Sequence, residues 1–270
     1  MTIVISSSVV LTDAFGADAN SPVFLVHTIV TIGNVVASGE DEDHPATNVA
    51  NPGTFNYWLA DDVDDHTLTV TTGYVDDLDG VGVAGHNFGT AAIAVKVQGQ
   101  YEDAGAWSDL TTDFIPADDR PIIFRFDPQS LYGIRLVMAE GTAIPRAAVL
   151  YVGKLMVMPR RTYVGHEPIN YSSEIEATNG LSESGQFLGR IVTGERFGTS
   201  FPFDNLPPAW LRTFLVPFLA RAKQEPFFFA WRPATYPRET GYGWLTGRAV
   251  PRNSKSNGFM AIDLPIGGLG

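Results

Sequence analysis

The sequence predicts a mainly β fold, in which a jelly-roll-type β-sandwich is followed by a β-rich domain with one α-helix. Three observations support this prediction. Short β-branched runs of strand length alternate with turn-rich segments in the first half of the chain. No helical periodicity precedes residue 158. The 27 glycines and 18 prolines favour many turns over long helices.

The charge changes sharply along the chain. Residues 1–158 contain 6 Lys/Arg and 21 Asp/Glu, a net charge of −15, whereas residues 159–270 contain 12 and 9, a net charge of +3. This step predicts two domains, 1–158 and 159–270, with the boundary near "MPRRTYVG". The acidic half argues against nucleic-acid binding, which needs a basic face. No apolar stretch of about 18 residues occurs, so no membrane span is expected.

The first domain contains seven strand-like runs, the first of which forms an N-terminal extension. They read "TIVISSSVVL", "VFLVHTIVTI", "HTLTVTTGYV", "AAIAVKVQG", "RPIIFRF", "YGIRLVMA" and "AAVLYVGKLMVM". Turns rich in Gly, Asp, Asn and Pro separate them, as in a β-sandwich. The chain has no cysteine, which excludes disulfides and thiolate chemistry and fits an intracellular folding environment.

The second domain contains one predicted helix, at about residues 207–223, after the strand-like segment "GQFLGRIVTGERFGTSFPF". Its apolar residues Leu211, Phe214, Leu215 and Phe218 recur at helical spacing. Pro217 should kink this helix, because it removes an amide donor. The run of apolar residues 227–231 does not alternate, so both of its faces should be covered, one by the domain core and the other by the helix or a neighbouring subunit.

Residues 30–158 carry a family resemblance. It rests on Ala37, Ser38, Pro45, Ala46, Asn48, Asn51, Gly53, Tyr57 and Trp58, followed by Val95, Val97, Gln98 and Trp107. This pattern resembles the galactose-binding-like, or discoidin-type, β-sandwich, and "GHNFG" is similar to a "GHNLG" segment of such domains in phage tail proteins. The resemblance implies loops at one end that bind sugars, lipids or proteins, and it does not imply catalysis.

Residues 160–270 resemble siphophage tail-tube and distal-tail modules, although the usual order places the ring module first. The resemblance implies a virion structural protein of the tail tip or baseplate, folded in the host cytoplasm. It also implies a cyclic oligomer, with a hexamer favoured, that contacts tail-tube and hub proteins. The assembly interface is predicted at Phe214, Phe218, Phe228, Trp231, Arg232 and Trp244. The alternative is a carbohydrate-binding adhesion module that contacts host surface glycans.

Four residues are the candidates for ligand binding: Trp107, His86, Asn87 and Tyr101. For His86 and Asn87 we favour a simpler interpretation, in which flanking glycines form a turn and both side chains bind loop backbone groups. Trp58 could stack on a sugar, but in the family pattern the equivalent tryptophan packs into the core.

The acidic residues Asp76, Asp77 and Asp79 are the candidates for a structural calcium ion, and no other cofactor is expected. An EF-hand is excluded, because the fifth and twelfth positions from Asp77 are Val81 and Phe88. An enzyme that cleaves glycans would need two carboxylates about 5–9.5 Å apart. None of the nine acidic residues of the second domain has a recognisable catalytic context, so we predict that the chain is not an enzyme.

Overall fold

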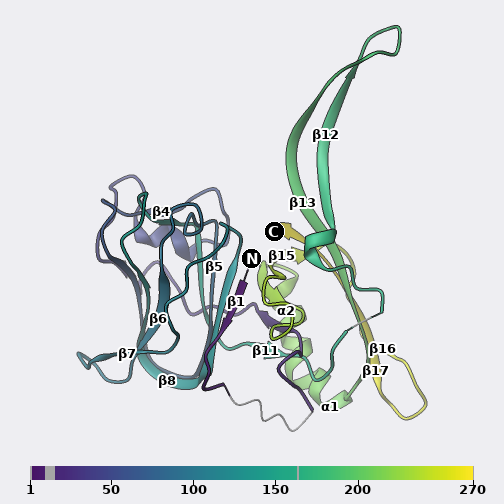
Figure 1. Cartoon of the computed structure of the whole chain (residues 1–270). Coiled ribbons are helices and arrows are strands. Elements are labelled where there is room, and N and C mark those ends of the chain that lie inside the picture. Colours follow the sequence, from purple (N-terminus) through teal and green to yellow (C-terminus); the bar gives the residue numbers. More distant parts are fainter. Residues whose placement is uncertain (1, 10–15, 163, 270) are drawn as a thin grey trace.

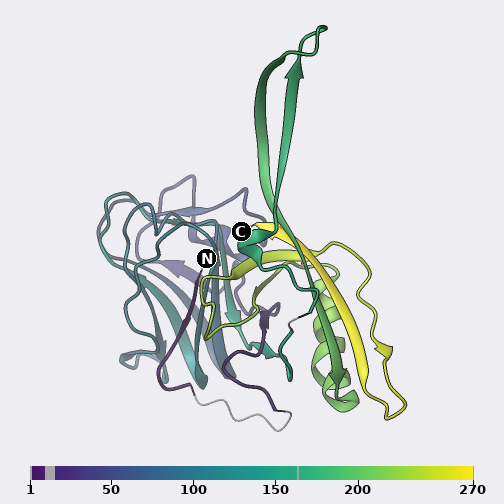
Figure 2. The same ribbon diagram turned by 45° about the vertical axis from the view of Figure 1, so that its right-hand side comes forward.

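The computed structural model describes residues 2–9, 16–162 and 164–269, apart from the side chain of Asp76. Two large sheets lie next to each other, and a long hairpin projects from the second (Figures 1 and 2). The predicted fold class is confirmed: the chain is mainly β, with a β-sandwich followed by a β-rich unit that holds one helix.

The first sheet has the order β10-β5-β8-β6-β7, with β1 beside β8 and β3 beside β5. Its strands are β1 (Thr2–Ile5), β3 (Val35–Ala37), β5 (His66–Ala84), β6 (Val95–Gln100), β7 (Trp107–Asp109), β8 (Ile122–Met138) and β10 (Val149–Gly153). A small sheet pairs β4 (Trp58–Leu59) with β9 (Arg146–Ala147), near the 3-10 helix η1 (Ala46–Ala50).

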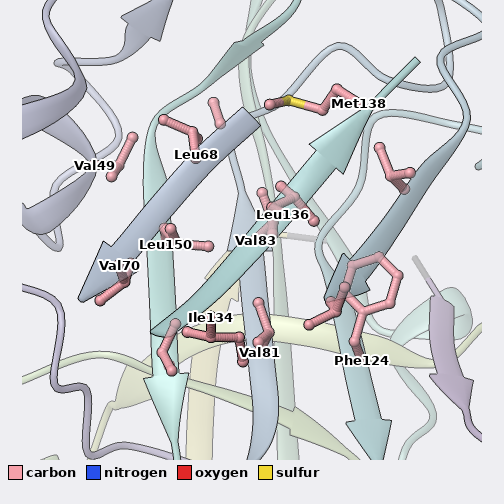
Figure 3. Close-up of a cluster of buried hydrophobic side chains, with 14 of the residues drawn as sticks. Val49, Leu68, Val70, Val81, Val83, Phe124, Ile134, Leu136, Met138 and Leu150 are labelled. Atoms are coloured by element: carbon pink, nitrogen blue, oxygen red, sulfur yellow. The ribbon is translucent and has the colours of Figure 1, made fainter. Parts of the chain in front are cut away.

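One bent strand pair makes the two layers of the sandwich. β5 and β8 are 19 and 17 residues long, and their register shifts three times between Thr71 and Gly80. Such irregularities bend a strand and increase its twist. As a result, Leu68 from the first half of β5 shares one buried core with Val81 and Val83 from the second half (Figure 3).

The second sheet has the order β11-β2-β14-β15-β17-β13-β12, with β16 beside β17. Its strands are β2 (Val23–Leu25), β11 (Met156–Val157), β12 (Ser173–Leu181), β13 (Phe187–Leu206), β14 (Phe227–Ala230), β15 (Thr240–Leu245), β16 (Arg252–Asn253) and β17 (Met260–Leu269). A short 3-10 helix, η2 (Ile169–Tyr171), precedes β12. The predicted boundary at residue 158 does not separate the strands of the two sheets. β2 and β11 precede this boundary and nevertheless belong to the second sheet.

The helix lies where the sequence predicts it. It consists of α1 (Pro208–Trp210), the π-helical turn η3 (Leu211–Leu215) and α2 (Val216–Ala222). Pro217 has no amide hydrogen, and the wide turn directly before it accommodates that missing hydrogen bond. Among the described residues, no helix is long and apolar enough to cross a membrane.

The two faces of the second sheet have different covers. Phe24, Phe227 and Phe229 pack with the helix in one core. Phe228 and Tyr242, on the other face, pack against the sandwich. The aromatic run is therefore covered on both faces, as predicted, but the second cover is the sandwich of the same chain.

Candidate functional site

The bend of β5 places an unusual tyrosine at one end of the sandwich. Tyr74 has a φ of 68°, a left-handed conformation that is uncommon for residues other than glycine, and it follows Gly73 with a φ of 66°. Its side chain is 57% exposed and packs edge-on against Tyr132, with ring centroids 5.1 Å apart. Such backbone strain is more frequent at functional sites than elsewhere, so this end of the sandwich is a candidate site.

The β6–β7 hairpin brings two more aromatic residues to the same region. Tyr101 directly follows β6 and is 44% exposed, and its hydroxyl donates to Gln129 Oε1 at 3.4 Å. Trp107 begins β7, opposite Gln100, and its indole lies close to Gly133 of β8. A methyl group at Gly133 would be 3.2 Å from that ring, so the glycine permits the close approach.

A polar network fixes the indole of Trp107. The Arg135 guanidinium lies over the ring, 4.4 Å from its centroid, and Arg135 Nε donates to Gln98 Oε1 at 2.8 Å. Gln98 Nε2 in turn donates to Asp109 Oδ1 at 2.6 Å, and this hydrogen bond is the main reason that the pKa of Asp109 lies below its usual range. The hydrogen bonds therefore orient the Arg135 guanidinium, which holds the Trp107 ring through a cation–π contact.

We call the side chains of Tyr74, Tyr101, Trp107 and Tyr132 the aromatic end. These rings combine apolar faces with polar tips, and amide, carboxylate and guanidinium groups adjoin them. The sequence predicts Trp107 and Tyr101 as ligand-binding residues, and the structure places both here. The sequence does not indicate that Tyr74 or Tyr132 belongs to the site, although Gly73 beside Tyr74 is a signal for an irregular strand.

His86 and Asn87 do not belong to this region. His86 is buried, where its Nε2 donates to the Arg120 carbonyl at 2.9 Å and its Nδ1 accepts the Phe88 amide at 3.3 Å. Burial lowers its pKa to about 4. Asn87 donates to the Ile144 carbonyl and accepts an amide hydrogen from Arg146. The prediction that they bind a ligand is corrected, and the interpretation that both bind loop backbone groups is confirmed.

Of the three residues predicted to bind calcium, the two whose side chains the structure describes, Asp77 and Asp79, have partners within the chain. Asp77 makes an ion pair with Lys154 at 2.7 Å, while Asp79 is buried and accepts the Leu155 amide hydrogen at 2.6 Å. Burial raises the pKa of Asp79 to about 7, which weakens it further as a metal ligand. The side chain of Asp76 lies outside the described part of the structure.

Another acidic group in the described residues has ligand atoms within 4.8 Å of one another: Asp61, Asp62 and His66. His66 Nε2 lies 2.9 Å from Asp62 Oδ1, and its Nδ1 lies 3.3 Å from Ser38 Oγ. Both ring nitrogens therefore have hydrogen-bond partners within the chain.

Three of the six predicted assembly residues lie in the interior of the chain. Phe218, Phe228 and Trp231 are buried, because the helix and the sandwich cover the sheet on both sides. Arg232 lies over the Trp231 and Tyr236 rings. Phe214 and Trp244 are exposed. The prediction is corrected for the three buried side chains, which cannot meet a neighbouring subunit.

Comparisons with known proteins find similar structures for about half of this chain. A chitosan-binding module of a chitosanase/glucanase from Paenibacillus sp. IK-5 is 12% identical, with a TM-score of 0.42, over 47% of this chain and 98% of the module. The family 32 carbohydrate-binding module of Clostridium perfringens NanJ, in complex with galactose, is 14% identical, with a TM-score of 0.40, over 48% and 98%. A C. perfringens family 32 module in complex with GalNAc-β-1,3-galactose is 15% identical, with a TM-score of 0.39, over 45% and 96%. No family model and no curated protein matches the chain.

Proposed function

We propose that the chain is a carbohydrate-binding protein whose sandwich holds a glycan at the aromatic end. The observation that carries this proposal is Trp107, an indole fixed by Arg135 at the same end as three tyrosines. A sugar ring has an apolar C–H face that packs on an aromatic ring, and its hydroxyls bind planar amides and carboxylates. Rigid aromatic residues with polar tips suit such an amphipathic ligand.

The charge of the region favours neutral sugars or amino sugars over acidic ones. Residues 1–158 have a net charge of −15, and two carboxylates, Asp103 and Asp109, adjoin the aromatic end. An acidic surface repels uronic acids and sulfated sugars and attracts cationic ones. Among glycans of equal length, we therefore expect uncharged or amino-substituted chains to bind best.

The test is a glycan array followed by calorimetry on the best ligand, with wild type and Trp107→Ala. We expect the variant to bind at least about tenfold more weakly, a loss of about 1.4 kcal/mol. Phe55→Ala is the control, because Phe55 is an exposed aromatic residue of the same unit outside the aromatic end. Binding that survives Trp107→Ala, or an array without any bound glycan, would contradict the proposal.

A structural role in a phage tail tip is the second candidate. The observation that favours it is the projecting β12–β13 hairpin, an element suited to contacts between subunits (Figure 1). Its test is mass spectrometry of purified virions. Absence of the chain from the particles would rule out this role and leave the glycan-binding proposal unaffected.

A further inference from the structure

The β12–β13 hairpin extends beyond the rest of the chain (Figures 1 and 2). β13 pairs with β17 only from Phe197 onward, so residues 173–196 form a ribbon of two strands. An isolated two-stranded hairpin is only marginally stable in water. The extension therefore gains stability from any partner that covers it.

The register of the hairpin gives it two unlike faces. On one face Ala177 lies opposite Val192, and Leu181 lies opposite Phe187. The same face also carries the pairs Ile175–Glu195 and Asn179–Arg190, so it is mainly but not wholly apolar. This face continues the side of the sheet on which Phe197 is buried against the helix-side core. Beyond the core the same face is uncovered, and Phe187 is 65% exposed.

The opposite face carries charges near its base, and farther out it pairs Thr178 with Ile191, which is 69% exposed. Glu174 lies opposite Arg196, and Arg196 makes an ion pair with Glu176 at 3.1 Å. A sheet with one apolar and one polar face normally buries the apolar one. The hairpin thus has one face that is more apolar than the other, and this face is largely exposed in the single chain.

We propose that the apolar face of the hairpin packs on the C-terminal unit of a second copy of this chain. Charge favours this partner, because residues 173–196 hold four Glu and two Arg, a net charge of −2. The remainder of residues 159–270 holds ten basic and five acidic residues, a net charge of +5. The hairpin points away from the unit that carries it, so the basic surface available to it is that of a neighbour (Figure 2).

The size of the hairpin sets the strength of the proposed contact. Strands of about ten residues span about 30 Å, and a ribbon about 10 Å wide offers about 300 Å² on each face. One such contact buries about 600 Å² over its two partners, which is below the roughly 1,200–2,000 Å² of stable complexes. A single contact is therefore weak, and a copy in an assembly gains stability from making two of them, because it donates one hairpin and receives another. Contacts between unlike surfaces of this kind lead to a ring or a filament.

The turn of the hairpin argues against insertion into a membrane. It consists of Ser182, Glu183, Ser184 and Gly185. This polar, acidic segment would have to enter the bilayer first, whereas the apolar side chains lie along the flank of the hairpin. Apolar side chains in this position can pack sideways against another protein surface.

Sedimentation velocity of the full chain, from about 1 to about 100 μM, tests the proposal. We expect wild type to self-associate and the double variant Phe187→Ser/Val192→Ser to associate at least about tenfold more weakly. The matched control is Phe55→Ser/Val36→Ser, which removes a phenylalanine and a valine that are 75% and 65% exposed on the sandwich. A monomeric wild type, or equal loss in both double variants, would overturn the proposal.

Two further measurements distinguish the hairpin contact from misfolding of the variant and from membrane binding. The hairpin variant keeps the acceptor surface, so an excess of it should cap wild-type assemblies and shorten them, which a misfolded variant could not do. Failure to cap would count against a hairpin-to-body contact. Flotation with phosphatidylcholine vesicles covers the membrane alternative, and vesicle binding that requires Phe187 and Val192 would overturn the proposal.

Discussion

Replacing Asp79 by asparagine should change how the stability of the chain depends on pH. Asp79 is buried in the second half of β5, close to Arg125, and accepts the amide hydrogen of Leu155 in the segment that joins β10 to the second sheet. Burial disfavours the charged form of this carboxyl group. This effect is larger than the opposite effect of the hydrogen bond from Leu155 and of the nearby cations. The pKa of Asp79 is therefore raised to about 7.

The sign and the size of the effect follow from this pKa. A carboxyl group with a raised pKa stabilises the fold fully below its ordinary pKa of 3.8, and this stabilisation is lost as the pH rises through about 7. The difference between the two values corresponds to about 4 kcal/mol. Asparagine keeps an acceptor for Leu155 and cannot ionise. The unfolding free energy of the variant minus that of wild type should rise by about 4 kcal/mol between about pH 4 and about pH 7.

His86 acts in the opposite direction over the same range. Burial lowers its pKa from 6.5 to about 4, so its contribution is present above pH 6.5 and is lost as the pH falls through about 4. In wild type the contributions of Asp79 and His86 therefore oppose each other between about pH 4 and about pH 7. The difference between variant and wild type isolates Asp79, because His86 is common to both.

Urea unfolding followed by tryptophan fluorescence, at about one-unit pH intervals from 4 to 8, measures this difference. The control is Asp77→Asn, which removes an exposed carboxylate that pairs with Lys154 and should change stability by less than about 1 kcal/mol at every pH. A flat difference curve for Asp79→Asn would refute the argument, because it would mean that Asp79 is already ionised and paired in the folded chain.

Two other substitutions give direct readouts. Trp58→Ala should lower the unfolding free energy by about 3–5 kcal/mol, since the indole is fully buried in the sandwich core; thermal unfolding measures this loss. Arg135→Gln should weaken glycan binding about threefold to tenfold by calorimetry, because it removes the cation that orders Trp107. A matching loss of thermal stability in Arg135→Gln would instead assign Arg135 to folding.

The sequence predicts those features that depend on local pattern and burial. The helix is predicted from the spacing of Leu211, Phe214, Leu215 and Phe218, of which all but Phe214 are buried. By contrast, β12 is not predicted, because it lies along the exposed hairpin and Asn179 and Gly180 interrupt its apolar residues Ile175, Ala177 and Leu181. Its strand conformation comes from pairing with β13, which is a tertiary effect.

The candidate site is predicted only in part, for a related reason. Trp107 and Tyr101 flank one hairpin turn, so the sequence places them together. Tyr74 and Tyr132 reach the same end only because β5 and β8 bend, and no local pattern encodes that bend. In the second unit, buried and exposed aromatic residues look alike in sequence, so Phe228 could not be assigned to its own sandwich before the structure.

The glycan site and the hairpin make a joint prediction about avidity. A shallow aromatic surface is expected to bind one sugar weakly, whereas several such sites in one assembly can bind a glycan-coated surface about 10²–10⁴-fold more tightly. The variant Phe187→Ser/Val192→Ser should therefore lose retention on a glycan-coated surface and keep its affinity for the free oligosaccharide. Trp107→Ala should lose both. Surface plasmon resonance and calorimetry on the same ligand separate these outcomes, and equal retention of wild type and the hairpin variant would show that assembly contributes nothing to binding.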